Sequence, residues 1–280
     1  MLKVLVLGHS GQLATSLRER LSETIFASRY GPIKIDLLNT GTIFDRISAI
    51  EPDIVINAAG MTSVDECEYK KDEAYLVNGI SLREIARYCI KKKIKLIHVS
   101  TDYVFDGKVG NYSEDSIPNP INFYGLSKLI GDTYAISCDD SVVVRTSGVF
   151  GMSKNFPIFV LERLSKGEKV FTINGYYSPI FAGILAAAIE KLLHTDYKGL
   201  LNVAGERTSR EIFAKRIADK FSLDRELIVQ SDGQINFVAK RPFDSSLNID
   251  KAQKILNFDF FSMDKNLNEF YENLRNIRNL

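Results

Sequence analysis

The first two thirds of the chain alternate short β-branched runs with amphipathic stretches of helical length. The apolar runs cover residues 2–7 (LKVLVL), 24–27, 53–57 (DIVIN), 94–99 (IKLIHV) and 141–145 (SVVVR), and the helical patterns lie near residues 12–21, 43–50, 73–92 and 122–136. Strands that are apolar throughout and separated by helices are typical of a parallel sheet covered on both faces. We therefore predict an α/β fold built on a doubly wound parallel sheet.

A looser pattern begins after about Gly148. Loops rich in Gly, Asn, Tyr and Pro cover residues 151–157 and 174–179, and helical patterns follow near residues 209–221 and 264–276. We predict that residues 1–147 form the sheet domain and that residues 180–203, with one helix and one strand, return to it. Residues 148–179 and 204–280 are expected to form a smaller C-terminal substrate-binding lobe.

Charge and hydropathy argue against two classes of partner. The 36 Lys and Arg residues nearly balance 35 Asp and Glu, whereas nucleic-acid-binding proteins carry a basic excess. The longest apolar runs reach about half the ~20 residues that a membrane span needs. We expect neither nucleic acid nor membrane as a partner.

The cysteines and the N-terminus bear on localisation. Three widely spaced cysteines without a CxxC motif, and an N-terminus without a signal-peptide pattern, predict a cytoplasmic protein.

A glycine turn joins the first strand to the first helix. Residues 8–14 read GHSGQLA, a G-x-x-G-x-x-A arrangement that begins with Gly8 and continues through Gly11. Glycines let the chain turn sharply and let a pyrophosphate approach the backbone, while the helix N-terminus supplies free N–H groups. An ordinary tight turn would read the same, and a second G-x-x-G at residues 107–110 follows no strand. The copy at residues 8–14 lies at the first strand–helix junction, and this position favours a Rossmann-type dinucleotide site.

The end of the second strand favours NADP. Ser28 and Arg29 stand where an acidic residue would bind the ribose 2′-hydroxyl of NAD, and Arg suits a 2′-phosphate instead. Arg29 as a plain surface residue, and NADH as the cofactor, remain the alternatives. Asp36 is a candidate contact on the adenine side. Small residues after the strand at 53–57 leave room for a flat cofactor, although helix packing explains them nearly as well; they are Ala58, Ala59 and Gly60.

One Tyr–Lys pair is placed for catalysis. Tyr124 and Lys128 lie four residues apart and therefore on one helix face, where a cation can stabilise the phenolate of a proton-relaying tyrosine. The same spacing occurs at Tyr30/Lys34, which Gly and Pro interrupt, and at Tyr88/Lys92, which leads into a lysine cluster. Only Tyr124 begins its helix and follows a polar strand end.

That polar strand end carries Thr101, at the carboxyl edge of the sheet where open α/β folds bind substrates. Its hydroxyl can hydrogen-bond a carbonyl oxygen that Tyr124 protonates. The three histidines are isolated from one another, so we expect no metal site. Neither a G-x-S-x-G elbow nor a P-loop is present, which argues against serine hydrolases and NTPases.

With these motifs the chain resembles the dTDP-4-dehydrorhamnose reductase family of the extended short-chain dehydrogenase/reductase superfamily. The resemblance rests on residues 8–13 (GHSGQL), 52–68 (PDIVINAAGMTSVDECE), 100–107 (STDYVFDG), 118–128 (PNPINFYGLSK), 144–147 (VRTS) and 240–248 (KRPFDSSLN). It implies reduction of the 4-keto group of a deoxythymidine diphosphate sugar by a nicotinamide cofactor, in the last step of dTDP-rhamnose synthesis.

The resemblance also implies particular site residues. Its catalytic trio falls on Thr101, Tyr124 and Lys128. Its cofactor contacts fall on Gly11, Gln12, Leu13, Asp36, Leu37, Gly60, Met61, Thr62, Tyr124 and Lys128. We expect substrate contacts from Thr101, Asp102, Tyr103, Gly148 and Arg241. For Arg241 the alternative is a structural ion pair that closes the lobe on the sheet.

The chain departs from the family pattern in the substrate pocket. Gly148 stands where these reductases place a Trp, and residues 174–180 (NGYYSPI) replace an Asp-Gln stretch. Ser16 stands where some members carry a Glu in a metal-bridged dimer, so we predict no metal, and a homodimer is left open. The alternative functions are a nucleotide-sugar epimerase and a non-catalytic NADP-binding subunit similar to the methionine adenosyltransferase regulatory subunit.

Overall fold

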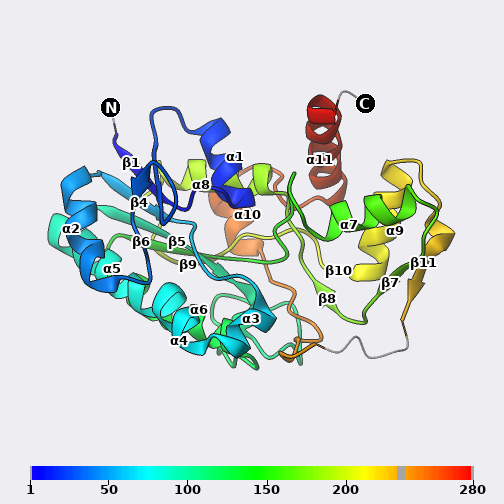
Figure 1. The fold of residues 1–280 in the computed structure, drawn as a ribbon, viewed down its shortest axis with the longest axis horizontal. Coiled ribbons are helices and arrows are strands. Elements are labelled where there is room, and N and C mark those ends of the chain that lie inside the picture. Colours follow the sequence, from blue (N-terminus) through cyan, green and yellow to red (C-terminus); the bar gives the residue numbers. More distant parts are fainter. Residues whose placement is uncertain (1, 232–236, 279–280) are drawn as a thin grey trace.

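Within residues 2–231 and 237–278, which this computed structural model describes, seven parallel strands form one central sheet (Figure 1). They are Val4–Leu7 (β1), Ile25–Ser28 (β2), Ile33–Lys34 (β3), Ile54–Asn57 (β4), Lys95–Thr101 (β5), Ser141–Thr146 (β6) and Gly199–Asn202 (β9). The strand order is β3-β2-β1-β4-β5-β6-β9. The winding reverses between β1 and β4, whose carboxyl ends therefore border a natural binding crevice. The predicted doubly wound sheet is confirmed.

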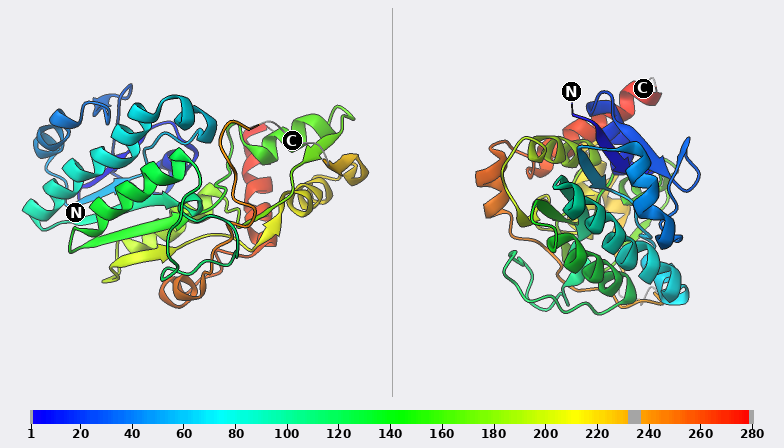
Figure 2. Two further views of the ribbon diagram at one scale, coloured as in Figure 1. Left: turned by 90° about the horizontal axis from the view of Figure 1, so that it is seen from below. Right: turned by 90° about the vertical axis from the view of Figure 1, so that its left-hand side faces the viewer.

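Helices cover both faces of this sheet (Figures 1 and 2). Helices α1 (Gln12–Arg20) and α8 (Ala182–Leu192) lie on one face, and α2 (Thr40–Ile50), α5 (Ser81–Lys92) and α6 (Phe123–Ile136) lie on the other. Successive strand side chains alternate between the two cores: Val4 and Val6 of β1 pack in one, and Leu5 and Leu7 in the other. Burial on both faces explains why the strands read as continuous apolar runs.

The smaller part of the molecule lies beyond the carboxyl edge of the sheet. It contains α7 (Phe156–Leu164), β7 (Val170–Thr172), β8 (Tyr176–Tyr177), β10 (Thr208–Ser209), α9 (Arg210–Lys220), β11 (Ile228–Gln230) and α11 (Met263–Arg278). Strand β7 pairs with β11 in parallel, and β8 pairs with β10 antiparallel. Phe150, which follows β6, contacts Phe213 of α9 and Phe270 of α11 with ring centroids 5.3 and 5.5 Å apart. Aromatic packing therefore fixes this lobe to the sheet. Helix α10 (Asp250–Leu256) packs beside β9 and α8.

The helical pattern over residues 73–92 is interrupted in the structure. After the short helices α3 (Val64–Tyr69) and α4 (Lys71–Ala74), residues Tyr75–Ile80 form a π-helical turn before α5 begins. Such wide turns often occur at functional sites because they redirect one side chain. Here Asn78 points back to the loop after β4. No helix among the described residues is both long and apolar enough to cross a membrane.

Candidate active site

The glycine turn brings the β1–α1 junction against the end of β4. Gly8 has a φ of +120°, and a Cβ there would lie 3.3 Å from the carbonyl carbon of Ala58. Gly11 caps α1 without a side chain, and a Cβ at Gly11 would meet no atom within 4 Å. Gly8 thus serves close packing, whereas the backbone at Gly11 borders open space that a ligand can approach.

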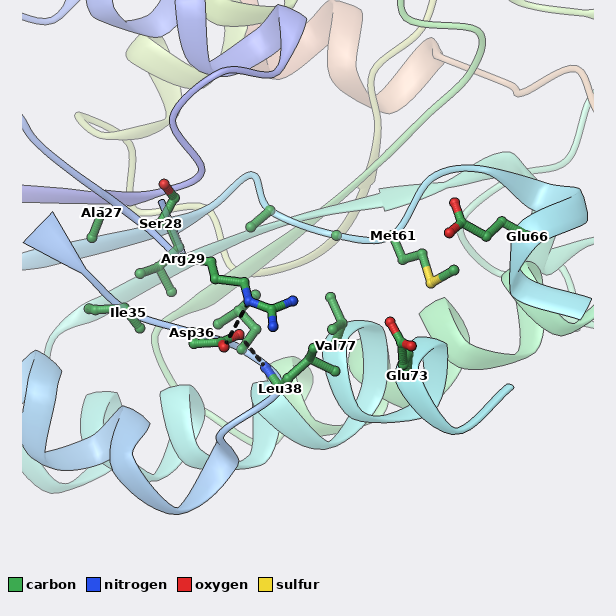
Figure 3. A pocket seen from close by; sticks show the side chains of 14 residues that line it. Ala27, Ser28, Arg29, Ile35, Asp36, Leu38, Met61, Glu66, Glu73 and Val77 are labelled. Atoms are coloured by element: carbon green, nitrogen blue, oxygen red, sulfur yellow. Dashed lines mark hydrogen bonds and ion pairs between the residues drawn. The ribbon is translucent and has the colours of Figure 1, made fainter. Parts of the chain in front are cut away.

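A cavity of about 280 Å³ lies at the carboxyl ends of β2 and β3 (Figure 3). Its lining joins predicted residues from two segments: Ser28, Arg29, Asp36 and Leu37 from one, and Ala59, Gly60 and Met61 from the other. Arg29 Nε lies 3.1 Å from Asp36 Oδ2, and the Leu38 backbone N–H donates to Asp36 Oδ1 at 3.0 Å. Asp36 therefore holds the Arg29 guanidinium at the cavity wall, while Glu66 and Glu73 lie at the opposite end of the cavity.

A second cavity, of about 510 Å³, contains the predicted catalytic trio. Thr101 at the end of β5, and Tyr124 and Lys128 on α6, line it together. It shares Ala59 and Gly60 with the first cavity, so the two form one continuous crevice. The other predicted residues that line it are Gly11, Gln12, Leu13, Ala58, Thr62, Asp102, Tyr103 and Gly148.

The start of α6 is held tightly, and this positions Tyr124. Asn122 caps the helix by accepting a hydrogen bond from the Gly125 N–H at 2.8 Å, and the Phe123 N–H donates to Glu68 Oε1 at 2.7 Å. A Cβ at Gly125 would lie only 2.0 Å from the Tyr103 carbonyl oxygen. Glycine at this position therefore lets the Thr101–Tyr103 segment pack directly on the first turn of α6.

Burial shifts the pKa values of the predicted catalytic pair in opposite directions. It raises the pKa of Tyr124, and a hydrogen bond with Thr101 opposes this rise. It lowers the pKa of Lys128 to about 8, while the Asp132 carboxylate acts in the other direction. Lys128 Nζ donates to the Val99 carbonyl oxygen at 2.7 Å. The spacing suggested that Lys128 would lower the pKa of Tyr124. Burial instead has the largest effect and raises it, so the phenol is protonated at neutral pH.

Asp102 is a buried organising group at the back of the cavity. Its carboxylate accepts hydrogen bonds from Ser245 Oγ at 2.6 Å, Ser147 Oγ at 2.7 Å and Thr101 Oγ1 at 3.1 Å. Burial raises its pKa, and the three hydroxyl donors favour the ionised form. Asp102 therefore joins the end of β5, the loop after β6 and the C-terminal lobe at a single point, and it holds the Thr101 hydroxyl in place.

A third cavity, of about 90 Å³, continues from the second toward the C-terminal lobe. The two share Asp102, Tyr103 and Gly148, and the third is also lined by Tyr177, Arg210 and Arg241. Arg241 Nη2 donates to Asp65 Oδ2 at 2.9 Å, while its Nη1 is buried without a hydrogen-bond partner. The ion pair agrees with a structural role for Arg241, which was the alternative to substrate binding. The Nη1 atom has no partner and is available to a substrate.

Sequence reasoning missed Asn78. Its side-chain oxygen accepts from the Met61 N–H at 2.8 Å, and its side-chain nitrogen donates to the Met61 carbonyl and to Ser127 Oγ, both at 3.0 Å. Asn78 thus connects the loop that lines the crevice to the helix that carries Tyr124. A π-helical turn within a regular apolar pattern leaves no periodicity signal, so the sequence offered no means of finding it.

A second missed group is the ionic cluster beneath Lys128. Asp132 lies one turn further along α6, with Oδ2 3.2 Å from Arg145 Nε and Oδ1 3.6 Å from His98 Nε2. His98 Nδ1 lies 3.2 Å from Asn57 Nδ2. Burial and the Lys128 charge lower the pKa of His98, so the imidazole is neutral. His98 is fully buried, but its Nε2 lacks a hydrogen bond.

The crevice fits an extended dinucleotide that carries a 2′-phosphate. Open space at the Gly11 backbone, small residues at Ala58–Gly60 and the basic side chain of Arg29 follow one another along it. Ser28 and Arg29 would hold the phosphate, and Tyr124 and Lys128 would border the reactive end. A doubly wound sheet with this crevice and a Tyr–Lys pair beside it is the arrangement of the short-chain dehydrogenase/reductases, and the chain is a protein of that class.

Comparison with known proteins places the chain more narrowly. It belongs to the family described as the RmlD substrate binding domain, whose model matches residues 2–276. Among curated relatives, a dTDP-4-dehydrorhamnose reductase of Aggregatibacter actinomycetemcomitans is 31% identical over 277 residues, covering 91% of this chain and 93% of the relative.

Two solved structures are similar over nearly the whole chain. A hypothetical dTDP-4-dehydrorhamnose reductase from Sulfolobus tokodaii is 45% identical with a TM-score of 0.88, covering 94% of this chain and 98% of the other. The dTDP-4-dehydrorhamnose reductase of Bacillus anthracis, solved in complex with NADP, is 28% identical with a TM-score of 0.89, covering 97% and 99%. Both similarities include the sheet and the C-terminal lobe, and they confirm the family expected from the motifs.

Proposed function

We propose that the protein is an NADPH-dependent reductase that converts dTDP-4-dehydrorhamnose to dTDP-rhamnose. The observation that carries this proposal is the convergence of Thr101, Tyr124 and Lys128 on one cavity that continues into the dinucleotide crevice. Relatives similar over nearly the whole chain bear the reductase name, and one is solved with NADP. We place the reaction in the cytoplasm and assign residues 148–179 and 204–280 to the lobe that receives the sugar nucleotide.

When bound, NADPH supplies the hydride for the sugar carbonyl. Tyr124 is the general acid: its raised pKa keeps the phenol protonated until the carbonyl oxygen gains negative charge and takes the proton. Thr101 donates its hydroxyl hydrogen to Asp102 in this structure, and it would turn that hydrogen toward the carbonyl oxygen when the substrate binds. Lys128 holds the cofactor ribose and, as a cation, stabilises the phenolate that remains after proton transfer. Thr101 and Lys128 are almost fully buried, which limits the access of water to these two side chains.

The intact trio favours an enzyme over a non-catalytic NADP-binding subunit. A binding subunit has no need of a protonated phenol beside a hydroxyl at the carboxyl edge of the sheet. The epimerase alternative draws no specific support from the crevice.

Purified protein tests the proposal directly. NADPH consumption should be seen with dTDP-4-keto-6-deoxy-L-mannose and should be slower with GDP- and UDP-linked analogues. Tyr124→Phe keeps the ring but removes the proton donor, so kcat should fall by about 10²-fold or more while NADPH still binds.

Tyr88→Phe is the matched control, since Tyr88 has the same Tyr–Lys spacing but packs against Phe44 of α2 and lines neither cavity of the crevice. Its turnover should equal that of the wild type. Turnover of Tyr124→Phe within a factor of about three of wild type would reject the proton-donor role.

A further inference from the structure

Arg210 is a cation without an anionic partner in the cavity nearest to the catalytic crevice. It is the first residue of α9, and among the residues that the structure describes it forms no ion pair with a carboxylate. Neighbouring arginines of the lobe are paired instead: Arg207 with Asp244 and Arg216 with Asp264. An arginine left unpaired at a cavity wall is available for an anion from outside the chain.

The surroundings hold the Arg210 guanidinium in a fixed position. Its Cζ lies 4.6 Å from the ring centroid of Tyr177 and 5.6 Å from that of Phe156, and Tyr103 lines the same cavity. Tyr103 in turn contacts the Tyr124 ring edge-to-face, with centroids 5.7 Å apart. The guanidinium is therefore preorganised one side chain away from the proton donor.

Two more donors lining the same cavity lack partners. Tyr177 is 7% exposed, and its hydroxyl is buried without a hydrogen bond, as is Nη1 of Arg241. Buried polar groups without partners are costly, and they are explained most simply by a ligand that completes them. The one carboxylate in the cavity lining, Asp102, already accepts three hydroxyl hydrogen bonds. The cavity thus offers two guanidinium groups and a phenol to an anion.

We propose that Arg210 binds the diphosphate of the nucleotide sugar, with its guanidinium held over the Tyr177 ring. The proposal rests on the proposed function, because a diphosphate is the anion that such a substrate carries next to its sugar. Two planar guanidinium groups, Arg210 and the free edge of Arg241, match the several oxygens of a diphosphate better than a single carboxylate or sulfate would. The diphosphate would then lie between the catalytic cavity and the C-terminal lobe.

Binding of deoxynucleotides to the whole protein tests this without turnover. Calorimetry would compare dTDP with dTMP, together with UDP and GDP, for wild type, Arg210→Ala, Arg210→Lys and Arg216→Ala. Arg216→Ala is the control, because it removes the same charge from the same helix at a residue outside the cavity. We expect wild type and Arg216→Ala to prefer the diphosphate over the monophosphate by about tenfold or more.

In Arg210→Ala that preference should shrink to within about threefold, with NADPH affinity unchanged, and Arg210→Lys should be intermediate. The ratio of the two affinities is insensitive to a partly unfolded sample, because unfolding lowers both equally. An unchanged ratio in Arg210→Ala, or a wild type that binds none of the diphosphates, overturns the proposal. Tight dTDP binding that depends on Arg210, but without NADPH consumption by any keto sugar, would reject the reductase function alone.

Discussion

Arg241 and Asp65 form an ion pair between the C-terminal lobe and α3, with Arg241 Nη2 2.9 Å from Asp65 Oδ2. Asp65 belongs to α3, directly after the loop that lines the dinucleotide crevice, and also accepts a hydrogen bond from the Ala239 N–H at 2.9 Å. Arg241 belongs to the C-terminal lobe and stacks on Phe237 at 4.7 Å. The pair therefore connects the cofactor side of the site to the substrate side.

The pair alone contributes little to stability, because the Asp65 side chain is 35% exposed. We predict that Arg241→Ala raises KM for the sugar nucleotide by about tenfold or more and lowers the melting temperature by no more than about 3 °C. NADPH affinity should be unchanged. Steady-state kinetics and thermal unfolding of the same preparation measure all three.

Asp65→Ala separates the two roles of Arg241. It removes the ion pair but leaves the guanidinium, so KM should rise by less than about threefold. In both variants KM could instead rise while NADPH affinity and melting temperature fall. That result would mean that Arg241 closes the lobe on the sheet and does not bind substrate.

Substitution by alanine should lower the stability of the protein at one glycine of the site and leave it unchanged at another. Gly148 has a φ of +49°, and a Cβ there would lie 2.6 Å from the Tyr177 ring. Gly148→Ala should therefore lower the free energy of unfolding by about 1–3 kcal/mol. Gly11 has a φ of −71° and open space around its Cβ position, so Gly11→Ala should leave stability unchanged.

The Gly11 methyl group would nevertheless occupy the surface that a pyrophosphate approaches. NADPH affinity of Gly11→Ala should fall by about tenfold or more. Chemical unfolding and cofactor titration distinguish the two variants. A Gly11→Ala protein with wild-type NADPH affinity would show that the pyrophosphate does not contact this turn.

Much of this architecture could be predicted from the sequence because it depends on local patterns. Buried parallel strands read as apolar runs. The glycine turn, the STDYVFDG segment and the Tyr–Lys pair are each short motifs that span only a few residues. Topology then brings strand ends together at one edge of the sheet, so Thr101, Tyr124 and Lys128 meet as expected.

The parts that could not be predicted depend on contacts between distant segments. Asp65 and Arg241 are 176 residues apart, and Arg210 reaches Tyr177 only after the lobe has folded. A single contact between distant segments produces no periodic pattern in the sequence, and an arginine in a loop is ordinarily predicted to be a surface residue. The direction of the Tyr124 pKa was likewise hidden, because burial rather than the neighbouring lysine determines it.

Arg29 should determine the choice of cofactor. Its side chain is half-exposed just after the end of β2 and pairs with Asp36 (Figure 3). Arg29→Ala should weaken NADPH binding by about 1.5–3 kcal/mol, roughly 10- to 150-fold, and leave NADH binding nearly unchanged. Arg20→Ala, which removes an arginine paired with Glu190 away from the crevice, is the control. Equal weakening of both cofactors would mean that Arg29 does not read the 2′-phosphate.

Lys128 should make cofactor binding sensitive to alkaline pH. Burial lowers its pKa to about 8, so the ammonium is present below that pH and is lost as the pH rises. NADPH affinity should therefore fall by up to about tenfold for each pH unit above 8.

Unfolding cannot explain such a fall in NADPH affinity. The unfolded lysine keeps its usual higher pKa, so the unfolded chain binds more protons between the two values and the Lys128 contribution to stability rises with pH. The neighbouring His98 is already neutral and does not titrate in this range. Fluorescence titration of NADPH between about pH 7 and 10 measures the effect, and Lys128→Arg, whose guanidinium stays charged, should bind with an affinity that does not change across it. A wild type whose NADPH affinity is flat over that range would refute the role given to the Lys128 charge.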